Sequence, residues 1–414
     1  MEFLNVFVRD VLVGKLFEVS DKLSFSYDEN YSHSAEALPI SLSLPLNGSF
    51  ESDAVEAFFS GLLPDENLKK KLARYFKISE NNTFALLKEI GAECAGAISV
   101  LPAAKIPYEP NEPEYNELSE EQSYTLLSEL QKIPLGVDFD GYFRVSGSGA
   151  QDKLMAMVKD GKVALPLNGT PSTHIIKPEI QSYPNSQFDE YFCMTLAGRM
   201  GLNVPKVSLL HLRDKTFFVT ERYDRATAEN GYIIRLHQED FCQAMHINPK
   251  IKYENEGGPS IKACYNCLKN NSSLAGRDCV RFLETLMFNF LIGNGDAHGK
   301  NFSLLYDKEK IIFAPLYDLM SSMALREFNR KEKMAMKIDG EYLFEHIFMR
   351  KFAKLAIELE LKEDIFAQIL QNRFSNMLEV SANLRDELQK DKSTASPVYD
   401  KICEVIEKNY QQLV

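Results

Sequence analysis

The chain has 414 residues, of which 45% are hydrophobic and 26% are charged, and its formal net charge is −12. This length predicts two or three packed units rather than one small core. The acidic balance argues against a general polyanion binder, because phosphate contacts need clustered Lys and Arg. No apolar stretch approaches the length of a membrane span, and seven scattered cysteines fit reduced thiols. We therefore expect a cytoplasmic protein with no membrane contact.

Residues 1–104 predict a small α/β unit. Alternating apolar residues up to Tyr27 are typical of a hairpin followed by a third strand. Helical spacing comes next and is broken at Pro64, so that Asp65 is expected to be the N-cap of a second helix. The segment "GAISVLP" predicts a strand that closes the unit.

The rest of the chain divides by composition. Prolines and acids dominate the start of 105–135, which predicts a linker, and "SEEQSYTLLSELQ" predicts a helix that docks on the next unit. Over 136–240, strand patterns alternate with Gly-rich turns, and one helix ends at Gly201. Residues 241–414 are mainly helical in pattern, with one hairpin inside. A strand-rich half followed by a helix-rich half predicts two lobes with a cleft.

The segment "RVSGSGAQDK" (144–153) can approach an anion. Gly147 and Gly149 allow backbone N–H groups to come close to a phosphate, and Ser146 and Ser148 add hydroxyls. The pattern is neither a P-loop nor G-x-G-x-x-G, and on its own the segment is better explained as an ordinary hairpin turn.

Three charged residues at element ends are further candidates. Lys177 closes an apolar strand and can place a charge on a phosphate, although a surface lysine is the simpler interpretation. Glu190 begins a helix, where it can pair with Lys177 or complement the helix dipole. Asp318 follows the later hairpin and can be either a cation ligand or a helix N-cap.

The stretch "LIGNGDAHGKNFSLL" (291–305) carries a polar loop between an apolar helix and an apolar strand. Asp296 and Asn301 are five residues apart, as in the phosphoryl-transfer loop H-R-D-x-x-x-x-N. In that loop the Asp accepts the proton of the attacking hydroxyl and the Asn holds Mg²⁺. Asn301 and Asp318 can share one hard cation through oxygen ligands.

The order of these pieces is that of kinase-type folds: Gly-rich hairpin, strand lysine, helix glutamate, D-x-x-x-x-N loop and a later Asp. The sequence resembles the HipA family of serine/threonine kinases, the toxins of HipBA-type toxin–antitoxin modules, almost from end to end. The resemblance is carried by "FFSGLLPDE", "GAECAGAISVLP", "RVSGSGAQDKL", "STHIIKP", "DEYFCMTLAGRMGLNVP", "ERYDR", "RLHQEDFCQA", "KYENEGGPSI", "GNGDAHGKNFSLL" and "YDLMSS".

The resemblance implies an α+β, two-lobed protein-kinase-like (HipA) fold with a small α/β N-terminal subdomain (1–104) and a mainly helical C-terminal lobe. It implies ATP and Mg²⁺ as cofactors, with Asp296 as the catalytic base and Asn301 and Asp318 as metal ligands. The residues that it implies at the nucleotide are Ser146, Gly147, Ser148, Gly149, Ala150, Gln151, Lys177, Glu221, Arg222, Tyr223, Gln238, His298 and Lys300.

The resemblance also implies regulation and partners. Ser146 matches the serine that the family autophosphorylates, but Ser148 stands where a small apolar residue is expected, so the choice between the two stays open. The implied partners are a HipB-like helix-turn-helix antitoxin, through which DNA would be contacted, and a protein substrate, which is an aminoacyl-tRNA synthetase in the better-known members. Nothing in these residues selects the substrate.

Two other functions remain open at this stage. A small-molecule phosphotransferase of aminoglycoside-kinase type shares the Asp, Asn and Asp of the site, although the unit at 1–104 favours the HipA interpretation. A catalytically inactive corepressor or binding partner would keep the fold without phosphate transfer, but every expected active-site residue type is present.

Overall fold

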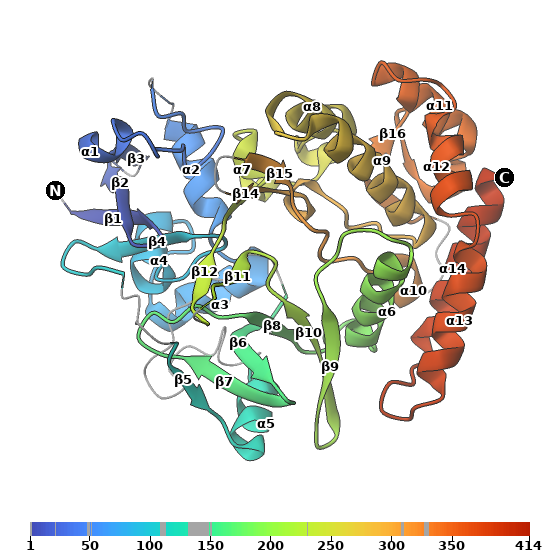
Figure 1. Cartoon of the computed structure of the whole chain (residues 1–414), viewed down its shortest axis with the longest axis horizontal. Helices are drawn as coiled ribbons and strands as arrows, with labels where there is room; N and C mark the ends of the chain where they lie inside the picture. The colour runs from blue at the N-terminus through green and yellow to red at the C-terminus, as the bar shows by residue number, and fades with distance from the viewer. Residues whose placement is uncertain are drawn as a thin grey trace.

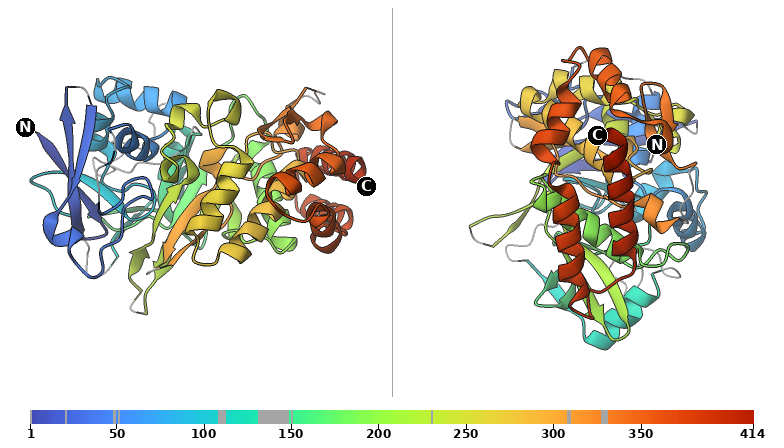
Figure 2. Two further views of the ribbon diagram at one scale, coloured as in Figure 1. Left: turned by 90° about the horizontal axis from the view of Figure 1, so that it is seen from above. Right: turned by 90° about the vertical axis from the view of Figure 1, so that its right-hand side faces the viewer.

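The structure is a computed structural model that describes residues 2–20, 22–47, 50, 52–107, 113–130, 149, 151–229, 231–307, 310–326 and 331–414. The described residues form an α+β fold in which an N-terminal unit, a central sheet and a helical lobe follow one another (Figures 1 and 2). Each of these regions has its own cluster of buried apolar side chains. The predicted fold class is confirmed.

The N-terminal unit is an antiparallel sheet covered by helices, and its strand order is β3-β2-β1-β4. Leu4, Val6 and Leu16 are fully buried, as the alternation of apolar residues predicts. The predicted helical stretch is broken at Pro64, and Asp65 is the N-cap residue of α3. The elements are β1 (Phe3–Val8), β2 (Val11–Val19), β3 (Lys22–Tyr27), α1 (Glu29–Ser32), α2 (Ser52–Gly61), α3 (Glu66–Phe76), α4 (Thr83–Ile90) and β4 (Ile98–Pro102).

The central sheet has the order β5-β7-β6-β8-β10-β9. The predicted "KDGK" turn joins β6 to β7, with both Asp160 and Gly161 at positive φ, which such a tight hairpin requires. Strand β5 lies within the stretch predicted as a linker and pairs with β7. The elements are β5 (Tyr115–Glu117), α5 (Glu120–Ser128), β6 (Leu154–Lys159), β7 (Lys162–Pro166), β8 (His174–Lys177), α6 (Ser186–Arg199), β9 (Val207–Leu212) and β10 (Lys215–Glu221).

Two small sheets connect the central sheet to the helical lobe. β11 (Arg225–Thr227) pairs with β12 (Ile233–Arg235). β13 (His237–Asp240) pairs with β14 (Ser303–Asp307), which pairs with β15 (Lys310–Phe313), so the predicted hairpin is present. This pairing brings the end of the central region alongside the strand that follows the polar loop.

The C-terminal lobe is built on the buried helix α9, whose residues from Phe282 to Leu291 are all buried. α9 spans Ala275–Leu291, and the other elements of the lobe are α7 (Phe241–Ala244), α8 (Ile261–Asn271), α10 (Ser322–Leu325), β16 (Lys333–Ile338), β17 (Glu341–Leu343), α11 (Met349–Glu358), α12 (Ile365–Arg373), α13 (Met377–Gln389) and α14 (Val398–Leu413). Among the described residues, every helix is too short or too polar to cross a bilayer.

The N-terminal unit docks on the rest of the molecule through buried polar contacts. Glu93 accepts hydrogen bonds from the guanidinium groups of Arg222 and Arg225, at 3.2 and 2.6 Å. Arg235 donates to the Ser99 hydroxyl at 2.8 Å. Buried charges left unpaired would be strongly destabilising, so these pairs fix the position of the unit.

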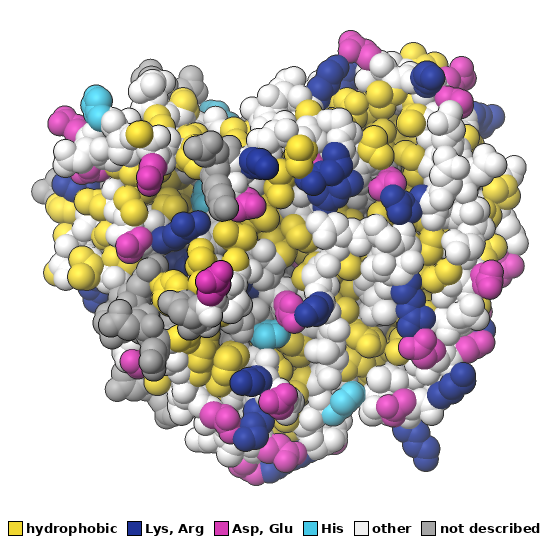
Figure 3. All heavy atoms as spheres, viewed as in Figure 1, with side chains coloured by type: hydrophobic (Ala, Val, Ile, Leu, Met, Phe, Trp, Pro, Cys, Tyr) yellow, Lys and Arg dark blue, Asp and Glu magenta, His cyan; other side chains and the backbone are white. Residues whose placement is uncertain are grey.

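On the face of the molecule in Figure 3, basic side chains lie among acidic ones. The described part of this face therefore does not form a broad basic surface, in agreement with the net charge of −12.

Candidate active site

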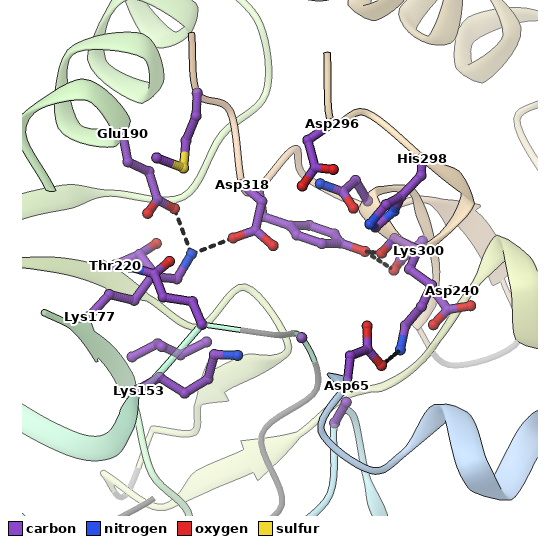
Figure 4. Close-up of a pocket in the computed structure, with 18 of the residues that line it drawn as sticks. Asp65, Lys153, Lys177, Glu190, Thr220, Asp240, Asp296, His298, Lys300 and Asp318 are labelled. Carbon is purple, nitrogen blue, oxygen red and sulfur yellow. Dashed lines mark hydrogen bonds and ion pairs between the residues drawn. The ribbon is translucent and has the colours of Figure 1, made fainter. Parts of the chain in front are cut away.

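A cavity of about 500 Å³ lies where the three regions meet. Its walls come from the N-terminal unit, from the ends of the central strands and from the loops that leave α9 and β15 (Figure 4). Many of the side chains that line this cavity are charged, and both acidic and basic groups are among them. The cavity is lined by twelve of the residues that were predicted at the nucleotide, at the metal or as the catalytic base: Gly149, Gln151, Lys177, Glu221, Arg222, Tyr223, Gln238, Asp296, His298, Lys300, Asn301 and Asp318.

Lys177 lies at the centre of a three-residue ion pair. Its Nζ donates to Glu190 Oε1 at 2.6 Å and to the carboxylate of Asp318. Burial alone would lower the pKa of Lys177, but the carboxylates of Asp318 and Glu190 outweigh it and raise the pKa. The lysine therefore stays charged, and β8, α6 and the segment after β15 are held around one cation (Figure 4).

Glu190 and Asp318 differ in their exposure to water. The Glu190 side chain is 2% exposed, and burial raises its pKa to about 7 despite the neighbouring Lys177. The Asp318 side chain is 42% exposed and faces the cavity. Burial would raise the Asp318 pKa, but Lys177 outweighs this and lowers it, so Asp318 presents an anionic oxygen to the cavity.

Asp296 is held by the loop that leaves α9. Its backbone N–H donates to Asn294 Oδ1 at 3.0 Å, and the Asn294 side chain donates to Asn289 on α9 at 3.0 Å. Its carboxylate accepts a hydrogen bond from the Tyr253 hydroxyl. The surrounding protein raises the Asp296 pKa through desolvation, while the Tyr253 bond opposes this. A partly enclosed carboxylate of raised pKa is suited to accept a proton.

Asn301 ends the short 3₁₀ turn Gly299–Asn301 and also lines the cavity. Among the described residues, no cluster of three His, Cys, Asp or Glu side chains suited to a metal occurs. A site of one carboxylate and one amide fits Mg²⁺, which usually binds one or two protein oxygens together with substrate phosphates.

His298 is a neutral imidazole at this wall. Burial, with Lys252 and Lys300 nearby, lowers its pKa to about 3. Its ring lies edge-on to Tyr253, with 5.0 Å between the ring centroids. Within the described structure its Nδ1 has no hydrogen-bond partner, which leaves one polar atom of this buried side chain for a ligand or water.

The segment 221–223, which was predicted at the nucleotide, borders the same cavity. Glu221, Arg222 and Tyr223 all line it, and Tyr223 donates through its hydroxyl to the side chain of Gln238. The Arg222 guanidinium is directed to Asp224 and Glu93 instead, at 2.8 and 3.2 Å. Its side chain is therefore structural, and its backbone N–H already donates to the Thr173 carbonyl at 2.9 Å.

The Gly-rich loop is described only at its end. Ser146, Gly147, Ser148 and Ala150 lie outside the described residues. Gly149 has φ +102°, a backbone conformation that residues with a side chain rarely adopt, so glycine is favoured at this position.

The structure adds residues that the sequence did not single out as site residues. Lys153 is buried at the cavity wall, where burial and the nearby Lys177 lower its pKa to about 8. Asp65, Lys252 and Tyr253 line the cavity as well. Lys153 could have been found from its position within the Gly-rich segment. The other three lie in the motifs "FFSGLLPDE" and "KYENEGGPSI", which pointed to the family but not to a place in the site.

The fold and the site define a two-lobed protein of kinase-like architecture. The family model described as "HipA-like C-terminal domain" matches residues 145–381, and the one described as "HipA N-terminal domain" matches residues 4–101. The chain therefore belongs to the HipA family, as the sequence motifs predicted.

Relatives and a solved structure agree with this assignment. The chain is 38% identical to "Putative kinase Y4mE" of Sinorhizobium fredii over 81% of its own length and 80% of the relative. It is 30% identical to "Serine/threonine-protein kinase toxin HipA" of Shewanella oneidensis, over 82% and 79% of the two chains. A structure of HipA with HipB and operator DNA from Shewanella oneidensis has a TM-score of 0.84 at 25% identity, covering 99% of this chain and 97% of that one.

Proposed function

We propose that this protein is a HipA-type toxin kinase that transfers the γ-phosphate of ATP to a serine or threonine hydroxyl of a protein. The observation that carries the proposal is the buried Lys177, ion-paired to Glu190 and Asp318 in the same cavity that Asp296 borders. Phosphoryl transfer needs little covalent chemistry from a protein, but it needs cations and dipoles fixed around the phosphates.

The residues have distinct roles in this reaction. Lys177 and Lys153 would contact the phosphates of ATP, and the backbone of 221–223 would meet the adenine. Bound Mg²⁺, held by Asn301 and Asp318, would neutralise the charge of the β- and γ-phosphates. Asp296 would take the proton of the attacking hydroxyl as the new P–O bond forms and ADP leaves. The bond from Tyr253 to Asp296 supports this role, because a substrate hydroxyl could donate to the same carboxylate.

The test is phosphate transfer by the purified protein. With Mg²⁺, labelled ATP and a cell lysate, we expect label on the protein itself and on a small number of lysate proteins, which mass spectrometry would identify. The Asp296→Asn variant is the matched control, since it should bind ATP without transferring phosphate. ATP binding with no transfer to any protein would refute the kinase proposal in favour of an inactive partner protein. Transfer only to small molecules would favour the aminoglycoside-kinase type.

Autophosphorylation and the partner form part of the proposal. We expect the incorporated phosphate at Ser146, although Ser148 offers a second hydroxyl in the same loop. Modification there would add charge to a loop that covers the phosphates and would oppose ATP binding. The Shewanella oneidensis complex with HipB and operator DNA supports a HipB-like antitoxin as the partner through which DNA is reached. Expression of the chain alone should arrest growth, and co-expression of that partner should relieve it.

A further inference from the structure

The turn between α2 and α3 carries a side chain of the N-terminal unit into the cavity. Asp65 occupies the N-cap position of α3, yet its carboxylate makes no capping bond to that helix. Instead, Oδ1 accepts from Lys300 Nζ at 2.6 Å and Oδ2 accepts from Lys252 Nζ at 3.1 Å (Figure 4 shows the first). The side chains of all three residues are at most 8% exposed. The carboxylate therefore serves a contact across the molecule rather than its own helix.

The Asp65 carboxylate allows the ammonium groups of Lys252 and Lys300 to lie close together. Two buried ammonium groups within reach of the same oxygen pair would repel each other in the absence of an anion between them. Burial would raise the pKa of Asp65, but Lys300 and Lys252 outweigh it and hold the pKa well below its usual range. The anion is thus permanent, and Lys300 is fixed one residue before Asn301.

The same turn also holds the described end of the Gly-rich loop. The Asp65 backbone N–H donates to the Gly149 carbonyl at 3.2 Å, and Pro64 forms a parallel bridge with Gly149. Nearly two helical turns further along α3, Lys71 Nζ lies 2.9 Å from Asp152 Oδ1. The loop end and the catalytic loop are therefore tied to one short segment of the N-terminal unit.

We propose that Asp65 is a positioning residue of the nucleotide site, acting through Lys300 and through the backbone at Gly149. The proposal rests on the function proposed above and deepens it, because it makes the N-terminal unit a part of the ATP site rather than a separate module. Lys252 takes the second oxygen and keeps the carboxylate oriented. Removing the charge while keeping the size of the side chain should displace Lys300 from the phosphates.

The test is the affinity for MgATP, measured by calorimetry on the full chain. Asp65→Asn is expected to weaken binding about tenfold and to raise KM by a similar factor, with kcat changed much less, since coupled charge pairs differ by about this much. Asp65→Glu, which keeps the charge, should recover part of the affinity. In the Lys300→Met background, Asp65→Asn should add less than about threefold, because the two changes remove one interaction.

The control is Ser99→Ala, which removes the buried hydrogen bond between Ser99 and Arg235. This bond also holds the N-terminal unit in place, but Ser99 does not line the cavity. The control variant should leave MgATP affinity unchanged. Equal losses in Ser99→Ala and Asp65→Asn would overturn the proposal, because docking alone would then explain both. Additive losses in the double variant, or tighter binding in Asp65→Asn, would overturn it as well.

A second measurement needs no nucleotide. Hydrogen exchange of the backbone amides at 299–303 should be faster in Asp65→Asn than in the unmodified protein, and unchanged in Ser99→Ala. Gly299 and Asn301 donate to Lys252 and His298 carbonyls at 3.3 and 2.9 Å, so a displaced lysine pair should loosen both. If the unmodified protein fails to bind MgATP, the proposed function fails. The exchange rates still decide whether Asp65 orders this loop, and equal rates in all three proteins would refute it.

Discussion

Replacing Lys177 with Met should separate the stability of the site from its chemistry. Methionine keeps an unbranched apolar stem but leaves the Glu190 carboxylate, whose side chain is 2% exposed, without its cation. Breaking a buried ion pair by removing one partner costs about 3–5 kcal/mol. The Asp318 side chain is 42% exposed, so water can replace most of its lost contact, and its share should stay below about 1 kcal/mol. We therefore expect the lower end of the range, and mainly from Glu190.

The pH dependence follows from the pKa of Glu190. That pKa is raised from an ordinary 4.5 to about 7 with Lys177 present, and removing Lys177 should raise it further. A carboxyl group with a raised folded-state pKa destabilises the fold only where it must ionise, so below pH 4.5 it costs nothing and the cost grows as the pH rises. Up to about pH 7, ionising Glu190 costs the unmodified protein and Lys177→Met the same free energy. Above pH 7 only Lys177→Met continues to lose stability, by about 1.4 kcal/mol per pH unit.

The assay is urea unfolding followed by far-UV circular dichroism, because the chain contains no tryptophan. At about pH 9, two units above the Glu190 pKa, Lys177→Met should be less stable than the unmodified protein by about 3 kcal/mol. At about pH 6 the difference should fall to about 1 kcal/mol or less. The double variant with Glu190→Gln should regain most of the stability at pH 9 but no phosphate transfer. Equal stability differences at the two pH values would refute the reasoning.

Further predictions concern the reaction itself. Asp296→Asn should lower phosphate transfer by about 10²–10⁴-fold with ATP binding retained, and near-normal turnover would contradict its role as the base. Tyr253→Phe removes a bond that lowers the Asp296 pKa, so the acid limb of the kcat/KM profile should move to higher pH, and an unmoved limb would count against the contact. Ser146→Ala should abolish phosphate incorporation into the chain, which mass spectrometry can check against label at Ser148. Chelation by EDTA should stop transfer and added Mg²⁺ should restore it, whereas transfer in EDTA would exclude a metal role for Asn301 and Asp318.

The elements that the sequence predicted well are those with strong local patterns. The helix that became α9 has apolar residues at helical spacing, and the hairpin after it has two apolar runs joined by a short polar turn. Strand β5 was missed because three residues are too few to show alternation, and a proline- and acid-rich stretch around them resembles a linker. The hairpin of β16 and β17 was missed within a region of helical spacing. The pairing of β5 with β7 is tertiary, and no local window contains it. The turn between β16 and β17 does carry a local hairpin signal, Asp339-Gly340, but the helical spacing around it hid that signal.

The site divides in the same way. Asp296 and Asn301 could be singled out because a fixed spacing of five residues carries their chemistry. The sequence indicated that Lys177 could pair with Glu190, and in the structure Lys177 Nζ lies 2.6 Å from Glu190 Oε1. Asp65 was expected only as a helix N-cap, since the two lysines that it binds are 187 and 235 residues away in sequence. Residues so far apart in the sequence form no motif of fixed spacing, so their contact could not be predicted.

The acidic partners explain how an acidic protein can keep a phosphate site. Four lysines converge on one cavity in a chain of net charge −12: Lys153, Lys177, Lys252 and Lys300. Without anions between them, their mutual repulsion in a buried setting would lower their pKa values or force the lobes apart. Glu190 and Asp65 each hold a lysine in place from a different region of the molecule. The positive charge is therefore local to the cavity, and it is held in place from the N-terminal unit as well as from α6.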